Sequence, residues 1–228
     1  MIIAIDGPAG SGKSTVTKLL AEKLGFLHID TGAMYRALTL KTLETKTDIT
    51  KSRAVTALAR KSKIDLREDP RGPLKVYLDE RDVSLEIRKP RITRHVSDIA
   101  KIPGVRKIML QLQRKVGSKH DCILEGRDIG TAVFPDADIK FFIDAQFNER
   151  VQRRYKDMKD LKISGVTLTD VARDLNNRDT IDSTRKCAPL KKAKDAVHID
   201  TTHMSIEEVV KRLLKEIKAR SSNTKKSQ

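Results

Sequence analysis

The chain has 228 residues, a net charge of +16 and an aromatic content of 4% without tryptophan. This length suits one sizeable domain with a smaller insertion, and the scarcity of aromatics predicts an aliphatic core, as in a parallel sheet covered by helices. The two cysteines lack the spacing of zinc ligands, and no apolar stretch approaches the length of a transmembrane helix, so we expect a cytoplasmic protein without a membrane partner. The charge indicates anionic partners, but it does not choose among nucleotides, nucleic acid and lipid headgroups.

A glycine-rich segment directly follows the first apolar run, Met1 to Ile5. It reads GPAGSGKS from Gly7 to Ser14, the spacing of a P-loop, whose backbone N–H groups curl around phosphate oxygens. Lys13 would reach the β and γ phosphates, and the Ser14 hydroxyl would ligate Mg²⁺. The alternative is a glycine-rich turn with an incidental lysine, but a strand before it and a helix after it favour a nucleoside triphosphate site. The predicted ATP-binding residues are Gly7, Pro8, Ala9, Gly10, Ser11, Gly12, Lys13, Ser14 and Thr15.

Short β-rich runs recur along the chain with helical patterns between them, which predicts an α/β fold with a parallel sheet. Behind the P-loop, apolar residues repeat at helical spacing from Val16 to Leu24, and Gly25 is placed to end that helix. The five expected strands are residues 2–5, 26–29, 121–124, 139–143 and 196–199.

The stretch 63–89 breaks this rhythm. Alternating apolar residues lie between the turn-rich segments 68–73 and 79–82, so we expect antiparallel hairpins that form a small insert. Helical pattern resumes at about Thr93, is interrupted at Pro103 and Gly104, and continues over 105–116 and then 148–175. Ser205 and Glu208 make a capping box for a last helix, and the polar tail 221–228 is expected to be disordered.

Polar and charged groups follow the apolar runs, so they should gather at the carboxyl edge of the sheet, where open α/β folds bind ligands. Arginines are frequent at these loop edges and in the helical segment 148–175. Their guanidinium groups bind phosphates bidentately, as a phosphoryl-transfer site needs, although a solvated basic helix face is the alternative for those in the helix. The arginines concerned are Arg36, Arg106, Arg127, Arg150, Arg153, Arg154, Arg178 and Arg185.

Four motifs together resemble bacterial cytidylate kinases, and the similarity spans nearly the whole chain. They are IDGPAGSGKST near the start, DTGAMYRA at 30–37, EGRDIGTAVFPDADIKFFIDA at 125–145 and RDTIDSTRKCAPL at 178–190. The resemblance implies transfer of the γ-phosphoryl group of ATP to CMP or dCMP with Mg²⁺ by a monomer. It also implies a P-loop nucleoside monophosphate kinase fold: a CORE with a five-stranded parallel sheet and flanking helices over 1–62 and 101–220, a β-rich CMP-binding insert over 63–100, and a helical LID within about 148–175.

The resemblance also implies roles for individual residues. Lys13 and the LID arginines Arg150 and Arg154 would stabilise the transferring phosphoryl group. The CMP phosphate would be held by Arg36, Arg127 and Arg185, the ribose by Arg178 and Asp182, and the cytosine by Ser97, Arg106 and Asp128, with Thr31 nearby.

The chemistry of the base supports the assignment of Asp128. Cytosine offers an amine donor beside a ring-nitrogen acceptor, and uracil reverses the two, so a carboxylate aimed at this edge favours cytosine. The alternatives are that Asp128 caps a helix or pairs with Arg127. Two residues depart from the family pattern: Thr31 keeps the hydroxyl of the more usual Ser, while Glu125 replaces the usual Asp and leaves its role toward Mg²⁺ open.

Three other functions compete with this interpretation. An adenylate or shikimate kinase would share the P-loop, but the chain has no four-cysteine LID, and the GRDIGT context argues against both. A GTPase would carry an Asn-Lys-x-Asp segment, which does not occur in the sequence. A nucleic-acid-binding protein with a regulatory P-loop would account for the charge, but aromatic side chains for base stacking are scarce, so we expect no nucleic-acid partner.

Overall fold

Five parallel strands form the central sheet of the computed structural model, which describes residues 1–69, 72–160, 163 and 165–224. Their order across the sheet is β2-β6-β1-β7-β8, and every neighbouring pair is parallel, as the sequence predicts. The strand that leads into the P-loop is therefore central. The strands are β1 (Ile2–Asp6), β2 (Leu27–Asp30), β6 (Cys122–Gly126), β7 (Ile139–Asp144) and β8 (Val197–Asp200).

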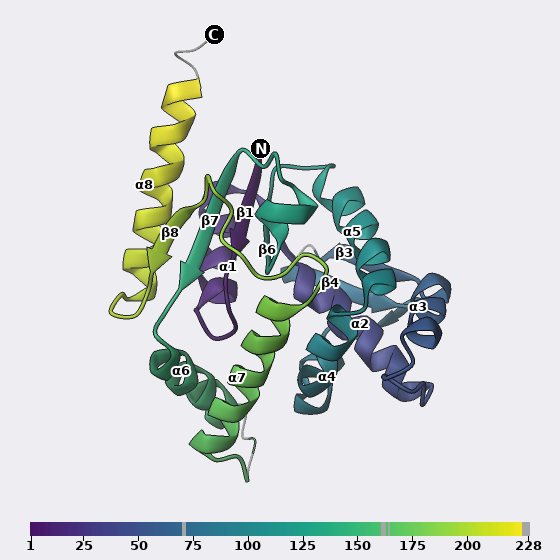
Figure 1. Ribbon diagram of the computed structural model, residues 1–228. Helices are drawn as coiled ribbons and strands as arrows, with labels where there is room; N and C mark the ends of the chain where they lie inside the picture. Colours follow the sequence, from purple (N-terminus) through teal and green to yellow (C-terminus); the bar gives the residue numbers. More distant parts are fainter. Residues whose placement is uncertain (70–71, 161–162, 164, 225–228) are drawn as a thin grey trace.

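One face of the sheet is covered by α1 (Lys13–Leu24) and α8 (Ile206–Thr224), which pack against each other (Figure 1). Leu20 of α1 and Leu213 of α8 share a core with apolar side chains of β1, β6, β7 and β8. The predicted ends of these helices are confirmed: Gly25 closes α1 in the left-handed conformation, and Ser205 and Glu208 form the capping box before α8. The prediction of a disordered tail from Ser221 is wrong for 221–224, where α8 continues, and residues 225–228 lie outside the described part.

The other face of the sheet packs against α5 (Pro103–Gly117) and a single π-helical turn, η2 (Ile129–Val133). Beside it, α2 (Thr31–Glu44) begins immediately where β2 ends, because Asp30 caps it by accepting a hydrogen bond from the Ala33 N–H. The turn after β6 and the start of α2 therefore both lie at the carboxyl edge of the sheet.

The predicted insert contains a three-stranded antiparallel sheet, as the sequence indicates. Its tight turn places Asp79 and Glu80 at positive φ, between β4 and β5. The insert does not have a core of its own, because its apolar side chains pack with those of α2, α3 and α5 in one cluster. The elements of this region are α3 (Ser52–Lys61), β3 (Ile64–Asp69), β4 (Gly72–Leu78), β5 (Arg81–Asp82), η1 (Glu86–Arg88) and α4 (Pro90–Ala100), the last of which begins three residues before the predicted Thr93.

The charged segment predicted as helical over 148–175 consists of two helices, α6 (Phe147–Asp160) and α7 (Leu168–Thr184). They pack on each other below the P-loop in Figure 1, around Val151, Met158 and Leu175. Thr167 and Asp170 form a capping box that starts α7. No helix in the described part of the chain is long and apolar enough to cross a membrane.

Candidate active site

A cleft of about 980 Å³ opens at the carboxyl edge of the sheet, between the P-loop, α2, α4, α7 and the start of α8. The P-loop residues Ala9 to Thr15 line one part of it, whereas Gly7 and Pro8 do not. Every residue predicted to bind CMP lines the cleft as well: Thr31, Arg36, Ser97, Arg106, Arg127, Asp128, Arg178, Asp182 and Arg185. The structure thus brings the two predicted nucleotide-binding sets together around one space.

The P-loop holds Lys13 in a buried position. Its Nζ donates to the carbonyl of Pro8 at 2.5 Å and to Ser11 Oγ at 3.1 Å, so the chain curls around its own ammonium group. Burial, with a further contribution from Arg127, lowers the pKa of Lys13 to about 7. A polyphosphate beside Lys13 would supply the negative charge that this site lacks.

Glycine is required at Gly10 for two reasons. Its φ of +77° is left-handed, and a Cβ there would lie 2.9 Å from the carbonyl oxygen of Arg150 on α6. The P-loop therefore packs closely on the first turn of α6.

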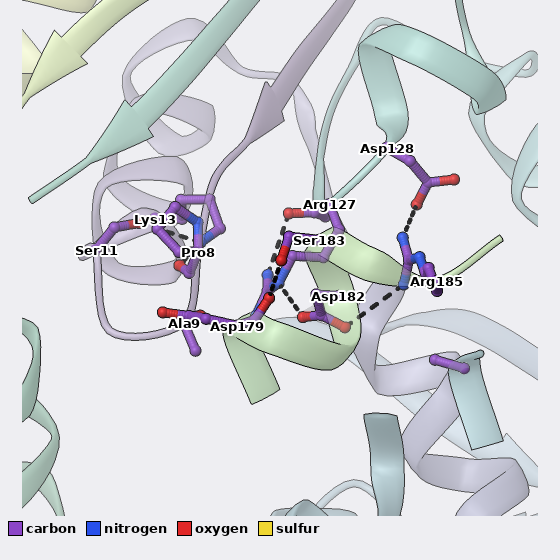
Figure 2. A network of polar contacts seen from close by, with 12 residues as sticks. Pro8, Ala9, Ser11, Lys13, Arg127, Asp128, Asp179, Asp182, Ser183 and Arg185 are labelled. Carbon is purple, nitrogen blue, oxygen red and sulfur yellow. Dashed lines mark hydrogen bonds and ion pairs between the residues drawn. The ribbon is translucent and has the colours of Figure 1, made fainter. Parts of the chain in front are cut away.

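Five of the predicted CMP-binding residues form one chain of alternating charges (Figure 2 labels all of them but Arg106). Arg106 pairs with Asp128; Arg185 contacts Asp128 at 3.3 Å and Asp182 at 3.5 Å; and Arg127 Nε donates to Asp182 at 3.0 Å. Asp128 makes no cap hydrogen bond and its partners are Arg106 and Arg185, so neither alternative considered for it is observed. This chain of charges, which we call the ion chain, holds three arginines and two carboxylates of the cleft in fixed positions on three segments: the first turn of α5, the turn after β6 and the end of α7.

Arg178 and Tyr35 lie beside the ion chain, and burial shifts the pKa of both. Burial, with a contribution from Arg127, lowers the pKa of Arg178 to about 10, and its Nε has no hydrogen-bond partner within the described structure. Tyr35 lies under the Arg106 guanidinium, 5.7 Å from it to the ring centre, and burial raises the pKa of Tyr35 to about 12. A neutral phenol and an undersatisfied guanidinium both suit a polar ligand in the cleft.

The insert contributes an arginine that the sequence analysis did not select. Arg88 lies 3.7 Å from Asp30, whose carboxylate also pairs with Arg36 at 2.5 Å. These charges lower the pKa of Asp30 against the opposing effect of its burial. Arg88 lines the cleft but belongs to no motif, so only its position after the insert's hairpins could have suggested a role.

The three arginines of α6 lie in different places. Arg154 and Arg153 line the cleft, and Arg153 also donates to the Thr201 carbonyl at 2.6 Å. Arg150 does not line it: its guanidinium donates to the carbonyl of Ala9 at 3.1 Å and pairs with Asp179 of α7, beside a separate pocket of about 320 Å³. Arg150 is thus placed to hold the P-loop onto α6 and α7, whereas Arg154 faces the cleft.

Buried Asp6 connects the P-loop strand to the turn after β6. Its carboxylate accepts hydrogen bonds from the N–H groups of Ile129 and Gly130, both at 2.8 Å. Burial raises the pKa of Asp6 to about 6 despite these two donors. The contact fixes η2, and with it the position of Asp128, relative to β1.

Ser14 and Glu125 form the part of the cleft that suits a metal ion. Ser14 Oγ donates to Glu125 Oε2 at 2.7 Å, and Glu125 Oε1 lies 2.9 Å from His28 Nε2. No group of three or more His, Cys, Asp or Glu placed to hold a metal occurs among the described residues. A hydroxyl and one carboxylate beside a phosphate site nonetheless fit Mg²⁺, which binds through few protein oxygens, phosphate oxygens and water.

Comparison with known proteins identifies the family. The sequence model described as cytidylate kinase matches residues 3–219. The chain belongs to the cytidylate kinase family. It is 48% identical to a cytidylate kinase of Clostridioides difficile strain 630, over 95% of this chain and 98% of the relative. It is 47% identical to one from Caldanaerobacter subterraneus, over 98% and 96% of the two chains.

The solved structures agree on the fold of this cytidylate kinase family member. A gluconokinase from Sinorhizobium meliloti superposes with a TM-score of 0.52 at 11% identity, covering 99% of this chain and 96% of the other. The chain therefore has a P-loop fold, and its assignment as a cytidylate kinase family member rests on the sequence relatives.

Several cleft residues of this family member were missed by sequence reasoning. Beyond Arg88 and Tyr35, the start of α8 supplies a wall that carries the apolar side chains of Met204, Ile206 and Val209. The capping box at Ser205 located this helix correctly, but no sequence motif indicates that its first turn faces the P-loop. The pattern of the sequence places Ile206 on the apolar face of this helix, and only the structure shows that it is 44% exposed at the cleft.

Proposed function

We propose that the chain transfers the γ-phosphoryl group of ATP to CMP or dCMP, forming ADP and CDP or dCDP. The observation that carries this proposal is the ion chain, which faces the P-loop across the same cleft. The phosphates of ATP and CMP would then lie between Lys13 on one side and Arg36, Arg127 and Arg185 on the other.

In the proposed reaction, an oxygen of the CMP phosphate attacks the γ-phosphorus directly, a new P–O bond forms and ADP leaves. No side chain has to act as a nucleophile, so the protein contributes alignment and charge neutralisation. Lys13 neutralises the phosphates of ATP. The acceptor phosphate is held by Arg36, Arg127 and Arg185, and Arg154 stabilises the phosphoryl group in transfer.

Ser14, with Glu125 behind it, would hold Mg²⁺ against the ATP phosphates. When bound there, the ion neutralises phosphate charge and fixes the geometry of the triphosphate. The apolar side chains of Met204, Ile206 and Val209 would contact the adenine ring, which needs a flat apolar wall.

At the acceptor end, Asp128 and Arg106 would recognise the edge of cytosine. Asp128 accepts from the exocyclic amine, and Arg106 with Ser97 donates to the acceptor groups beside it. In the free protein Asp128 pairs with Arg106 and Arg185. When cytosine binds, it therefore replaces some of these ion pairs and does not displace water from solvated side chains.

The test is an assay of ADP release with ATP and each nucleoside monophosphate in turn. We expect kcat/KM for CMP and dCMP to exceed that for UMP, AMP and GMP by at least about 100-fold, the scale of discrimination by specific hydrogen bonds. Equal rates with AMP and CMP would contradict the proposal. We further propose that the protein is cytoplasmic and monomeric. A dimer in a sedimentation-velocity measurement would contradict the monomeric state.

A further inference from the structure

Glu125 is a buried carboxylate that is held at both oxygens, and one of its partners belongs to no motif. Glu125 has only 4% of its surface exposed. Oε2 accepts a hydrogen bond from Ser14 Oγ on α1, and Oε1 lies 2.9 Å from His28 Nε2 on β2. The strand register explains the second contact: Asp30 pairs with Glu125 and His28 pairs with Ile123, so His28 and Glu125 are diagonal neighbours on one face of the sheet.

The hydrogen bond between Ser14 and Glu125 decides which way the serine hydroxyl points. A hydroxyl has one hydrogen and two lone pairs. When Ser14 donates its hydrogen to Glu125, both lone pairs are left for a ligand in the cleft, as a cation requires. If the carboxylate turned away, the hydroxyl would be free to rotate and to direct its hydrogen at the ion.

The contact with His28 keeps the Glu125 carboxylate from rotating. A glutamate side chain has three rotatable bonds, so a single hydrogen bond from Ser14 would not fix it. His28 Nε2 engages the second oxygen from the neighbouring strand, and backbone pairing between β2 and β6 sets its position. An aspartate at 125 would be one methylene shorter and could not contact Ser14 and His28 in the same way.

We infer that His28 is a positioning residue for the metal–nucleotide complex: by holding Glu125, it orients the Ser14 hydroxyl with its lone pairs toward Mg²⁺. The inference rests on the proposed function, because it assumes that the P-loop binds a nucleotide with Mg²⁺. Groups that orient metal ligands from behind typically affect metal affinity by about 10- to 100-fold.

The experiment measures ADP binding by isothermal titration calorimetry, once with excess Mg²⁺ and once with EDTA, so that no phosphoryl transfer is needed. The ratio of the two dissociation constants reports the metal's contribution. The matched variants are His28→Gln, whose amide nitrogen can occupy the place of Nε2, and His28→Asn, whose amide is too short to reach Glu125. Thermal melting checks that both variants are folded.

We expect His28→Asn to reduce the Mg²⁺-dependent ratio by about 10-fold while the constant in EDTA stays within about 2-fold of the unsubstituted protein, and His28→Gln to keep most of the ratio. In a Glu125→Asp background, His28→Asn should have little further effect, because the contact that it removes is already lost. This double-mutant comparison separates action through Glu125 from a direct effect of His28.

Three results would overturn the inference: an unchanged ratio in His28→Asn, equal losses in Mg²⁺ and in EDTA, or the same loss in His28→Gln and His28→Asn. Failure of the proposed function is distinguishable from these. It would appear as weak ADP binding by the unsubstituted protein, or as no phosphoryl transfer to CMP. The inference about His28 fails when the unsubstituted protein binds ADP more tightly with Mg²⁺ and one of these three results is obtained.

Discussion

Asp128 shares its carboxylate between two guanidinium groups in the free protein. Its place in the cleft was predictable, because it lies in a motif that directly follows a strand. Its partners were not predictable, because Arg106 and Arg185 are distant in the sequence and only packing brings them together. Arg88 and Tyr35 were missed for the same reason: what makes them cleft residues is the packing of α2 and the insert.

The first prediction concerns base selectivity at Asp128. Asp128→Asn replaces an acceptor by a group that can also donate, so the site can satisfy the carbonyl of uracil. We expect the ratio of kcat/KM for CMP over UMP to fall by at least about 10-fold, and we would measure it with both substrates in the ADP-release assay. Asp98→Asn, outside the cleft, serves as the control. An unchanged ratio in Asp128→Asn would remove Asp128 from base recognition.

Lys13 makes a second prediction, about stability and pH. Its pKa in the folded protein is about 7, below the ordinary 10.5, so the folded state disfavours the charged form. This preference lowers the free energy of unfolding by its full amount below pH 7, and the loss disappears as the pH rises toward 10.5. Lys13→Met should therefore raise the melting temperature at pH 7 by about 4 °C or more, which corresponds to at least ~1 kcal/mol, and abolish phosphoryl transfer.

The measurement compares the melting temperatures of the unsubstituted protein and of Lys13→Met between pH 7 and pH 10. The difference should shrink as the pH rises. Because ATP restores charge to Lys13, saturating ATP should also stabilise the unsubstituted protein and leave Lys13→Met nearly unaffected. If the difference in melting temperature stayed constant or grew with pH, the folded state would not lower the pKa of Lys13, and the prediction would be wrong.

At the scale of elements, the β strands and most helix ends follow directly from local pattern. Gly25 and the pair Ser205 and Glu208 mark helix ends correctly, because caps depend on a few adjacent residues. The segment 148–175 was predicted as one helical unit because its charge pattern is continuous, although the capping box of Thr167 and Asp170 was a readable sign of a new helix start. The tail prediction was wrong over 221–224 because an established helix can extend through residues of modest propensity.

The contact between the P-loop and α6 gives a third prediction. Arg150 is 8% exposed and pairs with Asp179, whose side chain is 22% exposed, so Arg150→Met leaves a partly buried carboxylate without its partner. We expect a loss of about 3 kcal/mol in the free energy of unfolding, measured with urea. Arg154→Met should change that free energy by less than about 0.5 kcal/mol, because the ion pair of Arg154 within the described residues is a long contact of 4.0 Å with Asp157.

Arg150→Met and Arg154→Met also distinguish a residue that stabilises the fold from one that acts on the transferring phosphoryl group. Arg154→Met should lower kcat by about 100-fold with little change in stability, as expected for the loss of one charge that faces the transferring group. If instead Arg150→Met were as stable as the unsubstituted protein and lost only kcat, Arg150 would act directly on the substrate, as the family resemblance implies.

On the scale of the whole molecule, the cleft gathers eight of the arginines and Lys13, but eight Asp and Glu residues line it as well, so the net charge of +16 lies mostly outside the cleft. The sequence analysis inferred an anionic partner from this charge but could not say how much of it serves the site. The structure places a large share of the arginines there because the carboxyl ends of the parallel strands meet at one edge.

The fourth prediction follows from the net positive charge of the whole protein. Raising the ionic strength from about 0.01 M to about 1 M shortens the screening length from about 30 Å to about 3 Å, so long-range attraction of ATP and CMP is lost. We expect kcat/KM for CMP to fall several-fold with KCl while kcat changes little. Sucrose at matched osmolality is the control, and equal effects of KCl and sucrose would contradict an electrostatic origin.

The order of strands has a consequence for how the protein is made. β1 is synthesised early, but Ile2 pairs with Cys122 of β6 and Ile3 with Ile139 of β7, so the central strand lacks both neighbours until much of the chain has left the ribosome. The side chains of Met204, Ile206 and Val209 emerge later still. A nascent chain with a finished P-loop thus has no nucleotide pocket, and ATP can stabilise only a nearly completed polypeptide.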